Sequence, residues 1–242
     1  MAWVPSRKKG YMVVLNLNLC HIIGKSRLFS KICHYNYPTS HYNYPTKGKQ
    51  MTNQSQVAAQ PISSEAKKVL DFWLQQNTKP FWFAKDEDFD KTVTAKFLAT
   101  LEQAKRGELG DWRASTKGRL AEIIVLDQFS RNIFRDSSQA FAQDGMALVL
   151  AQEIVKQPDF DKLNQDERNF ALMPFMHAES VIIHQQALPL FKKYASADTL
   201  AFEYKHQAII ERFGRYPHRN AILGRQSSEE EIAFLQQPNS SF

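Results

Sequence analysis

The stretch 115–135, STKGRLAEIIVLDQFSRNIFR, decides the fold class of this chain. Its centre, IIVL at 123–126, makes a helix in this region apolar on nearly every side. A helix of that kind is buried among other elements, whereas a surface helix is apolar on one side only. We therefore expect a buried helix over about 115–131, surrounded by further helices.

Helical patterns continue on both sides of this stretch, and no segment shows the sustained period-two alternation of a half-buried strand. Capping residues, glycines and apolar spacing predict helices over about 63–76, 86–106, 115–131, 136–156, 164–185, 187–195, 197–213 and 228–236. The spacing of Asn164 and Glu167, and of Ser228 and Glu231, predicts two capping boxes. Short connections favour antiparallel neighbours. The sequence thus predicts an all-α fold, an antiparallel helical bundle or array, formed by one domain over 51–242.

The net charge of +6 belongs to the first fifty residues. These residues carry eight Lys and Arg and no Asp or Glu, whereas the remaining 192 carry 23 basic and 25 acidic residues. The domain therefore has a formal charge of −2. A chain with this distribution gives no reason to expect a nucleic-acid partner.

Residues 1–50 lack the periodicity of a packed element, and we expect a disordered basic leader. Their apolar run, 11–24, is too short and too polar to span a bilayer, so no membrane partner is expected. The leader imitates a secretory signal without its cleavage site, and also a mitochondrial transit peptide. A tandem HYNYPT repeat, at 34–39 and 41–46, precedes Met51. We favour a third interpretation, in which Met51 is the natural start and the leader is not part of the native protein.

Both cysteines, Cys20 and Cys33, lie in the leader, so neither a disulfide nor a cysteine-based metal site can hold the domain together. An apolar core has to do so, and such a domain suits a reducing cytoplasm. We expect a cytoplasmic protein, and the sequence predicts no oligomeric state.

The first of three unusual segments is 127–135, DQFSRNIFR. Asp127, Arg131 and Arg135 recur at a four-residue spacing and would align if the helix continued. In one interpretation an Asp127–Arg131 pair supports the helix. In the other, these side chains lie on the wall of a cleft, because ion pairs inside a core are costly unless fully hydrogen-bonded.

The second segment, 173–184, contains Pro174, which removes one helical hydrogen bond. On a helix after it, His177, Ser180 and His184 would share one face at spacings of three and four. That face could supply a base or a ligand contact, or it could carry structural histidines. It has no acid and lacks the His-x-x-x-His spacing of zinc sites, so no metal site is predicted.

The third segment, 212–225, reads RFGRYPHRNAILGR and contains four arginines, a histidine and no acid. Gly214 and Pro217 indicate a turn, and backbone N–H groups at such turns often face anions. Arginine recognises carboxylate and phosphate groups with two parallel hydrogen bonds. The segment predicts either an anion-binding cleft or a solvated basic surface.

The strings LDQFSRNIFR, MPFMHAES, RFGRYPHRNAILGR and SSEEEIAFL resemble the bacterial family known as domain of unknown function 924. The resemblance covers about 65–236 and includes Trp82 and Phe83. It implies an all-α fold of the tetratricopeptide-like superfamilies and assigns no activity. The matching positions are Asp127, Gln128, Phe129, Arg131, Asn132, Arg135, Pro174, His177, Glu179, Phe213, Gly214, Arg215, Pro217, His218, Arg219, Asn220, Gly224 and Arg225. Two departures occur: Ser130 replaces a common proline, and Ala178-Glu179-Ser180 replaces Ser-Glu-Asp.

Three functional interpretations remain open. In the first, an Arg- and His-lined cleft binds a small phosphate- or carboxylate-bearing ligand, with catalysis possible. Its predicted ligand-binding residues are Arg131, Arg135, Arg212, Arg215, Arg219, Arg225, Asn220, Trp82 and Phe83, and its catalytic candidates are His177, His218, Glu179 and Asp127. In the second, a helical array binds a protein or peptide. In the third, arginines and carboxylates satisfy one another as a polar core, with Asp127, Glu179 and Glu122 as buried partners. No cofactor is expected, because phosphate-binding loops and dinucleotide motifs are missing from the sequence.

Overall fold

The computed structural model describes residues 61–238, 240 and 241, so the expectations for residues 1–50 lie outside the described range. Within that range the chain forms helices and no strand, which confirms the predicted all-α fold. The α-helices are α1 (Ser64–Trp73), α2 (Glu87–Lys105), α3 (Thr116–Ile124), α4 (Ser130–Ile133), α5 (Asp144–Ile154), α6 (Gln165–Met176), α7 (Val181–Tyr194), α8 (Ala197–Phe213) and α9 (Glu229–Leu235).

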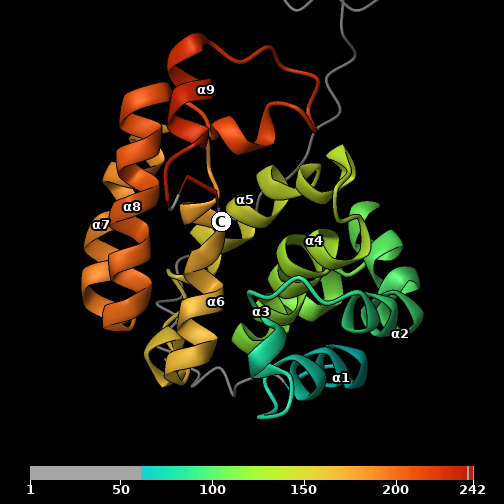
Figure 1. Cartoon of the computed structure of the whole chain (residues 1–242). Helices are drawn as coiled ribbons and strands as arrows, with labels where there is room; N and C mark the ends of the chain where they lie inside the picture. The colour runs from blue at the N-terminus through green and yellow to red at the C-terminus, as the bar shows by residue number, and fades with distance from the viewer. Residues whose placement is uncertain (1–60, 239, 242) are drawn as a thin grey trace, which may run out of the picture. The chain divides into compact units, whose positions relative to one another are not determined.

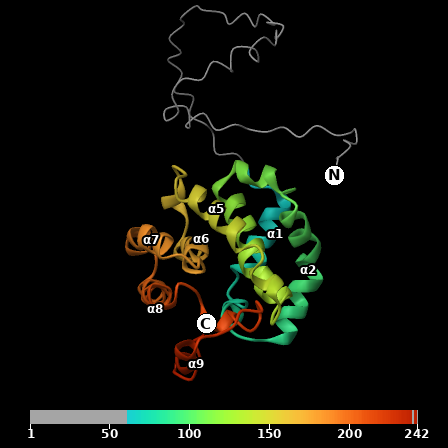
Figure 2. The same cartoon turned by 90° about the horizontal axis from the view of Figure 1, so that it is seen from above.

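Helix α3 lies at the centre of the helical packing, as its apolar sequence predicts. It contacts α1, α5 and α6, and its residues Leu120–Ile124 are fully buried. Helix α6 in turn contacts α7 and α8. Figures 1 and 2 both show α5 and α6 between the green and blue helices α1–α4 on one side and the orange pair α7 and α8 on the other. The chain therefore forms successive helical layers, with α5 and α6 in the middle.

Aromatic side chains join the N-terminal helices to α6. The Trp73 ring packs edge-on against Phe129 and Phe170, with centroids 5.4 and 5.7 Å away. Phe97 stacks on Phe129 at 4.7 Å. Buried aromatic pairs of this kind add stability beyond the area they bury. This aromatic cluster fixes α6, whose C-terminal end leads into the candidate site.

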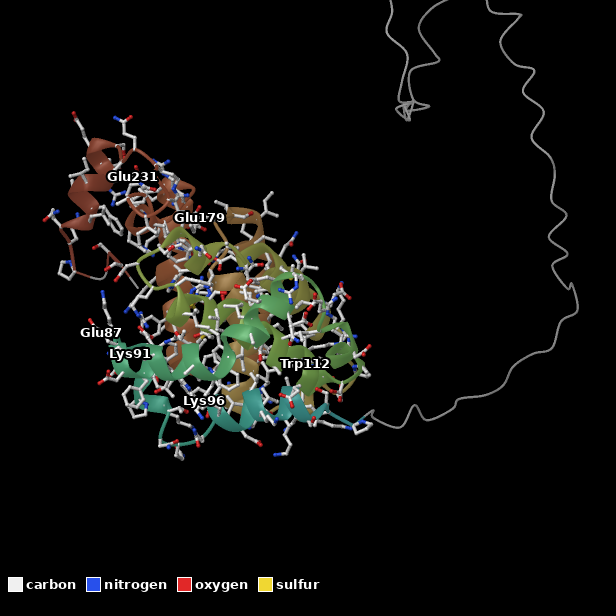
Figure 3. The ribbon with its side chains drawn as sticks, turned by 90° about the vertical axis from the view of Figure 1, so that its right-hand side faces the viewer. Glu87, Lys91, Lys96, Trp112, Glu179 and Glu231 are labelled. Carbon is white, nitrogen blue, oxygen red and sulfur yellow. The ribbon has the colours of Figure 1, made fainter. Side chains whose placement is uncertain are left out.

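Local capping determines where several helices begin. Asn164 with Glu167 and Ser228 with Glu231 form the two predicted capping boxes. Each satisfies backbone N–H groups that a helix start would leave without partners. Gly214 ends α8 in the left-handed conformation, with φ of +69°, which glycine adopts without strain. The chain then turns towards α9, which carries Glu231 (Figure 3).

The predicted helices 164–185 and 187–195 are wrong in one respect. The break between helices lies at 177–180 rather than near residue 186, because α6 ends at Met176 and Ser180 caps α7. His177, Ser180 and His184 therefore do not share one helical face. Pro189 lies within α7 at an exposed position, where water can satisfy the carbonyl that the proline leaves unbonded.

Two further helix predictions need correction. The helix expected from Asp136 begins only at Asp144, because Asp136 adopts a left-handed backbone with φ of 61° and a 3₁₀ turn follows at Ser138–Phe141. The helix expected over 115–131 is interrupted by a π-helical turn at Val125–Phe129 before α4 completes it. Both departures lie next to the candidate site.

Candidate functional site

The π-helical turn Val125–Phe129 places a carboxylate inside the apolar core. All five of its residues are buried, and Asp127 at its centre is only 1% exposed. π-Helical turns alter the regular spacing of side chains and occur frequently at functional sites. A buried ionised carboxylate is costly unless it is paired and hydrogen-bonded, so the partners of Asp127 determine its state.

Asp127 has three side-chain partners. Its Oδ1 atom lies 2.9 Å from Arg131 Nη1 and 2.7 Å from His177 Nδ1, and Gln128 Nε2 donates to Oδ2 at 2.6 Å. Burial alone would raise the pKa of Asp127, but the charge of Arg131 and the contact with His177 outweigh burial and lower the pKa. Asp127 is therefore ionised at neutral pH.

The ionised Asp127 determines the tautomer of His177. Burial and the charge of Arg131 lower the pKa of His177 below its ordinary value, so its ring is neutral at pH 7. A neutral ring facing a carboxylate carries its hydrogen on Nδ1 and a lone pair on Nε2. Nε2 bonds no described residue and is not among the atoms sealed from solvent. His177 thus presents a hydrogen-bond acceptor.

The turn that carries His177 is held by three side chains from other segments. Tyr216 Oη donates to Met176 O at 2.5 Å, Arg219 Nη1 to His177 O at 3.2 Å, and His184 Nε2 to Ala178 O at 3.0 Å. The last carbonyls of a helix have no helical partner, and here three successive ones are bonded in this way. The position of His177 is therefore fixed through its backbone as well as through Asp127.

His184 belongs to a second histidine–carboxylate pair, which is fully buried. His184 Nδ1 lies 2.7 Å from Glu203 Oε1, and neither residue is exposed. Burial raises the pKa of Glu203. Because Nε2 uses its hydrogen on Ala178 O, the short Nδ1 contact requires one further proton shared with Glu203. This proton keeps His184 oriented towards the turn.

Asp144, the first residue of α5, brings two arginines together. Arg131 donates Nη1 to Oδ1 at 2.8 Å and Nη2 to Oδ2 at 3.0 Å. Arg219 donates Nη1 to Oδ2 at 3.1 Å. Bidentate arginine–carboxylate pairs combine strength with fixed geometry. Asp144 therefore already occupies the position between two guanidinium groups that an external anion would otherwise take.

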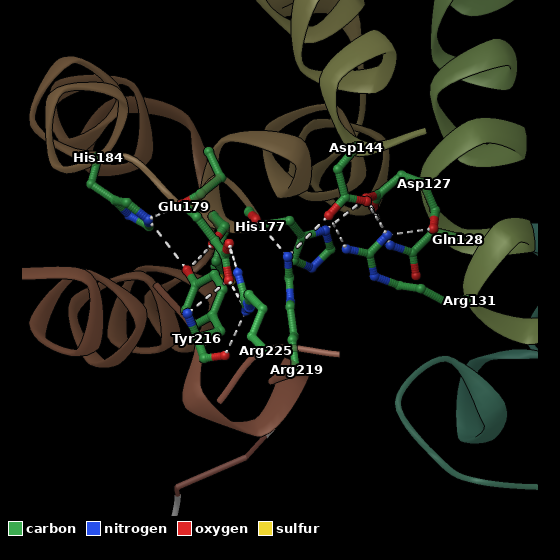
Figure 4. Close-up of polar contacts among 12 residues, drawn as sticks. Asp127, Gln128, Arg131, Asp144, His177, Glu179, His184, Tyr216, Arg219 and Arg225 are labelled. Atoms are coloured by element: carbon green, nitrogen blue, oxygen red, sulfur yellow. Dashed lines mark hydrogen bonds and ion pairs between the residues drawn. The ribbon is translucent and has the colours of Figure 1, made fainter. Parts of the chain in front are cut away.

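Arg219 is the cation of this cluster that lies at the surface of a pocket. Its guanidinium carbon lies 4.6 Å from the ring centroids of both Phe141 and Tyr216, so two aromatic rings enclose it. Its Nε atom is buried without a partner, whereas Nη2 has no recorded bond within the described chain and is not sealed from solvent. Nη2 of Arg219 is thus an available donor, and the Arg219 guanidinium lies beside the His177 ring (Figure 4).

The pocket beside these side chains has a volume of about 360 Å³. Its lining residues are Ser138, Phe141, Ala142, Asp144, Gly145, Leu148, His177, Ala178, Glu179, Ser180, Arg219 and Leu223. The polar side chains lie around His177 and Arg219, and α5 and Leu223 supply apolar ones. A concave site with a few converging polar groups is typical of small-molecule sites.

The structure brings part of each predicted segment together. His177, Glu179 and Arg219 line the pocket. Asp127 contacts the His177 ring, and Arg131 pairs with Asp127; neither of these two residues lines the pocket. Arg225 binds Glu179 through two hydrogen bonds, at 2.6 and 2.9 Å. That pair, together with the Tyr216 N–H, lowers the pKa of Glu179 although burial opposes the shift.

Other predicted site residues lie elsewhere. Arg135, Arg212 and Arg215 pair with Asp90, Glu230 and Glu231, respectively. Trp82 packs on Phe170 and donates Nε1 to Trp73 O, while Phe83 is 76% exposed. His218 and Asn220 flank the lining residue Arg219 in the sequence, and neither lines the pocket.

Four residues that matter here were not predicted as site residues from the sequence. Asp144 carried no signal, because an acid in the first turn of a helix is common. Phe141 and Tyr216, which enclose Arg219, are aromatic and do not belong to the charged pattern of the three segments. Glu203 could have been found, since it shares the buried side of α8 with His206 and Ile210 at helical spacing.

Charge compensation within the cluster is complete. Three arginines, Arg131, Arg219 and Arg225, are matched by three carboxylates, Asp127, Asp144 and Glu179. Glu122, fully buried, pairs with Arg113 in the same way. A polar core of mutually satisfied side chains therefore accounts for most of the unusual charges, and leaves His177 Nε2 and Arg219 Nη2 for an external group.

Two features are missing from the range 61–238, 240 and 241. No helix there combines the length and apolar character needed to cross a membrane. No three or more His, Cys, Asp or Glu side chains of that range are grouped so that they could hold a metal ion.

Comparisons with other proteins agree with this architecture. A family model described as "Bacterial protein of unknown function (DUF924)" matches residues 69–239. The structure of the protein of unknown function ATU0120 from Agrobacterium tumefaciens is 35% identical in sequence, with a TM-score of 0.67, and the match covers 71% of this chain and 97% of that one. A search of curated proteins finds no match.

Proposed function

The chain belongs to the DUF924 family of bacterial proteins of unknown function, and we propose that its helical domain binds a small anionic ligand in the pocket beside His177 and Arg219. The observation that carries this proposal is the pair of unused polar atoms on that pocket. His177 Nε2 is an acceptor and Arg219 Nη2 is a donor, and both belong to lining residues.

The rigidity of His177 supports a role in binding. An Asp127 contact at 2.7 Å, an Arg219 bond to its carbonyl and bonds to the two neighbouring carbonyls all hold it in place. A purely structural histidine would use both ring nitrogens within the protein, as His184 does. A fixed side chain with one free nitrogen resembles the oriented histidines of proton-transfer sites.

The same geometry gives His177 a chemical capability. A neutral imidazole whose Nδ1–H is bonded to a carboxylate can accept a proton at Nε2 from a bound hydroxyl, acid or water, and Asp127 then stabilises the resulting cation. Binding is the proposed function, and proton acceptance by His177 is the chemistry available to it.

Thermal unfolding of the full chain against carboxylic acids and phosphorylated metabolites tests the proposal. A ligand at a hundred times its dissociation constant stabilises the fold by about 2.7 kcal/mol, which raises Tm by a few degrees. The shift should disappear in His177→Asn and Arg219→Gln, and persist in Arg212→Gln, whose side chain pairs with Glu230 outside the pocket. If no compound shifts Tm, or if the shift survives both pocket substitutions, the proposal is wrong.

A further inference from the structure

The charge balance of the cluster restricts which anion the pocket can accept. The charged groups around His177 come from five segments of the chain. Asp127 belongs to the π-helical turn, Arg131 to α4 and Asp144 to α5. Glu179 lies in the turn between α6 and α7, and Arg219 lies in the 217–219 turn. With Arg225 bound to Glu179, these charges cancel. Unlike a typical phosphate site, the pocket therefore offers no excess of positive charge.

Asp144 further disfavours a phosphate ligand, because it bonds two arginines of the cluster. Arg131 gives both terminal nitrogens to Asp144, and Arg219 gives Nη1. Of the terminal nitrogens of Arg131 and Arg219, only Nη2 of Arg219 bonds no described residue, and the hydroxyls of Ser138 and Ser180 are the other side-chain donors of the lining. A phosphate group carries up to two charges, whereas the serine hydroxyls are neutral and the arginines are already matched by carboxylates, so burying the phosphate charge would be costly.

A carboxylate fits the remaining atoms. One oxygen can accept from Arg219 Nη2, and the other can face His177 Nε2 if a proton lies between them. That proton comes either with the acid or from water, and it resides on His177 as an N–H bond or on the ligand as an O–H bond. The added negative charge and the added proton together leave the cluster neutral.

The rest of the lining consists of apolar side chains, Gly145 and the two hydroxyl residues Ser138 and Ser180. Phe141, Ala142 and Leu148 lie on the α5 side, and Leu223 follows the 217–219 turn. A pocket of about 360 Å³ has room for several carbon atoms beyond the head group. Burial of each CH₂ of a ligand against such walls tightens binding roughly three- to four-fold.

From these constraints we propose, resting on the proposed function, that the pocket selects a monocarboxylate with an apolar chain over phosphate esters. The carboxylate lies between Arg219 Nη2 and His177 Nε2, and the chain lies along Leu148 and Leu223. Asp144 acts as a selectivity residue, because it occupies the two guanidinium groups that a phosphate would need.

Calorimetric titration of the full chain with hexanoate, acetate and hexyl phosphate tests this selectivity. Hexanoate should bind at least tenfold more tightly than hexyl phosphate, and acetate should bind more weakly than hexanoate. Leu148→Asn should weaken hexanoate binding several-fold. Val149→Asn is the matched control, since Val149 is 57% exposed, does not line the pocket and should leave binding unchanged.

Two further titrations test the roles of Asp144 and His177. Asp144→Asn frees donors of Arg131 and Arg219, so hexyl phosphate should bind at least tenfold more tightly to this variant than to the unmodified protein. Above the pKa of His177, hexanoate affinity should fall about tenfold per pH unit because binding takes up one proton, and His177→Gln should remove this dependence. Circular dichroism of each variant checks that the fold is retained.

The outcomes separate the two proposals. If hexyl phosphate binds the unmodified protein as tightly as hexanoate, and Arg219→Gln abolishes both, the selectivity is wrong and the pocket is still a ligand site. If Val149→Asn weakens hexanoate as much as Leu148→Asn does, the chain does not lie along Leu148 and the inference is overturned. If neither compound nor any other anion binds, both proposals are wrong.

Discussion

The Nδ1 atom of His177 lies 2.7 Å from Oδ1 of Asp127, although fifty residues separate them in the sequence. This contact joins the end of α6 to the π-helical turn Val125–Phe129 and leaves Nε2 of His177 free.

Asp127→Asn should lower the free energy of unfolding by about 3 kcal/mol or more, because removal of one partner from a buried ion pair leaves Arg131 less compensated. It should also lower the pKa of His177 further, since the Asp127 charge opposes the effect of burial. Urea denaturation and NMR titration of the His177 ring measure the two effects. Asp111→Asn, at an exposed position, should change neither, and an unchanged His177 pKa in Asp127→Asn would contradict the assigned contact.

Tyr216→Phe removes the hydroxyl that donates to Met176 O at 2.5 Å. Burial raises the pKa of Tyr216, so this hydroxyl stays protonated and the bond persists over the accessible pH range. Loss of a buried hydrogen bond should cost about 1–3 kcal/mol, measured by chemical denaturation. Tyr204→Phe, at a residue 46% exposed, is the control and should cost less than about 0.5 kcal/mol.

Stability should fall as the pH is lowered from 7 towards 4. Burial and the charge of Arg219 lower the pKa of His218 to about 4, whereas an unfolded histidine titrates near 6.5. Between these values the unfolded chain binds a proton that the folded chain does not, so the contribution is fully present above pH 6.5 and is lost as the pH falls. It amounts to at most about 3 kcal/mol.

Denaturation between pH 7 and 5 measures this effect with little contribution from carboxylates. His218→Gln should flatten the dependence in that interval. His206, whose pKa burial lowers to about 3, should account for part of the remaining slope. An identical slope in His218→Gln would show that folding does not lower the pKa of His218, and the prediction would be wrong.

Gly118→Ala should destabilise the fold, because a Cβ at this position of α3 would lie 1.9 Å from the backbone oxygen of Trp112. The backbone would have to move, at a cost of roughly 2–3 kcal/mol or more. Gly145→Ala provides the contrast, because no atom lies within 4 Å of the added Cβ. In helix α5 that alanine should be neutral or stabilising by up to about 1 kcal/mol. Thermal unfolding of both variants distinguishes these expectations.

The helices and their caps were predictable because their signals are local. The capping boxes at Asn164 and Ser228 and the glycine end of α8 at Gly214 each depend on residues within one helical turn. The buried helix α3 follows from its apolar run alone. These features needed no knowledge of distant contacts.

The end of α6 at Met176 could not be predicted in the same way. Local propensity allows the helix to continue through 177–180, and the hydrogen bonds that stabilise the break come from Tyr216, Arg219 and His184. The π-helical turn Val125–Phe129 is hidden for a related reason, since its sequence fits an ordinary helix.

The site was predictable in its residue types rather than in its pairing. His177, Arg219 and Arg131 were identified from charge and spacing, and each lies in or behind the pocket. Asp144, the carboxylate partner that both arginines share, lies on a different helix, at a position where an acid has an ordinary explanation. Sequence spacing reports neighbours along one helix and cannot show which charges meet across helices.

The bonds that hold the 176–178 carbonyls also determine when the pocket can form during synthesis. The Met176 carbonyl accepts a hydrogen bond from Tyr216, which is synthesised 40 residues later. Asp144 accepts one from Arg219, which is synthesised 75 residues later. Contacts this far apart in the chain form late in folding because loop closure opposes them. A nascent chain that has not yet released residue 219 from the ribosome can complete α1–α6 but cannot assemble the pocket. Ligand binding would thus report that synthesis has passed Leu223, the last residue of the pocket lining in chain order.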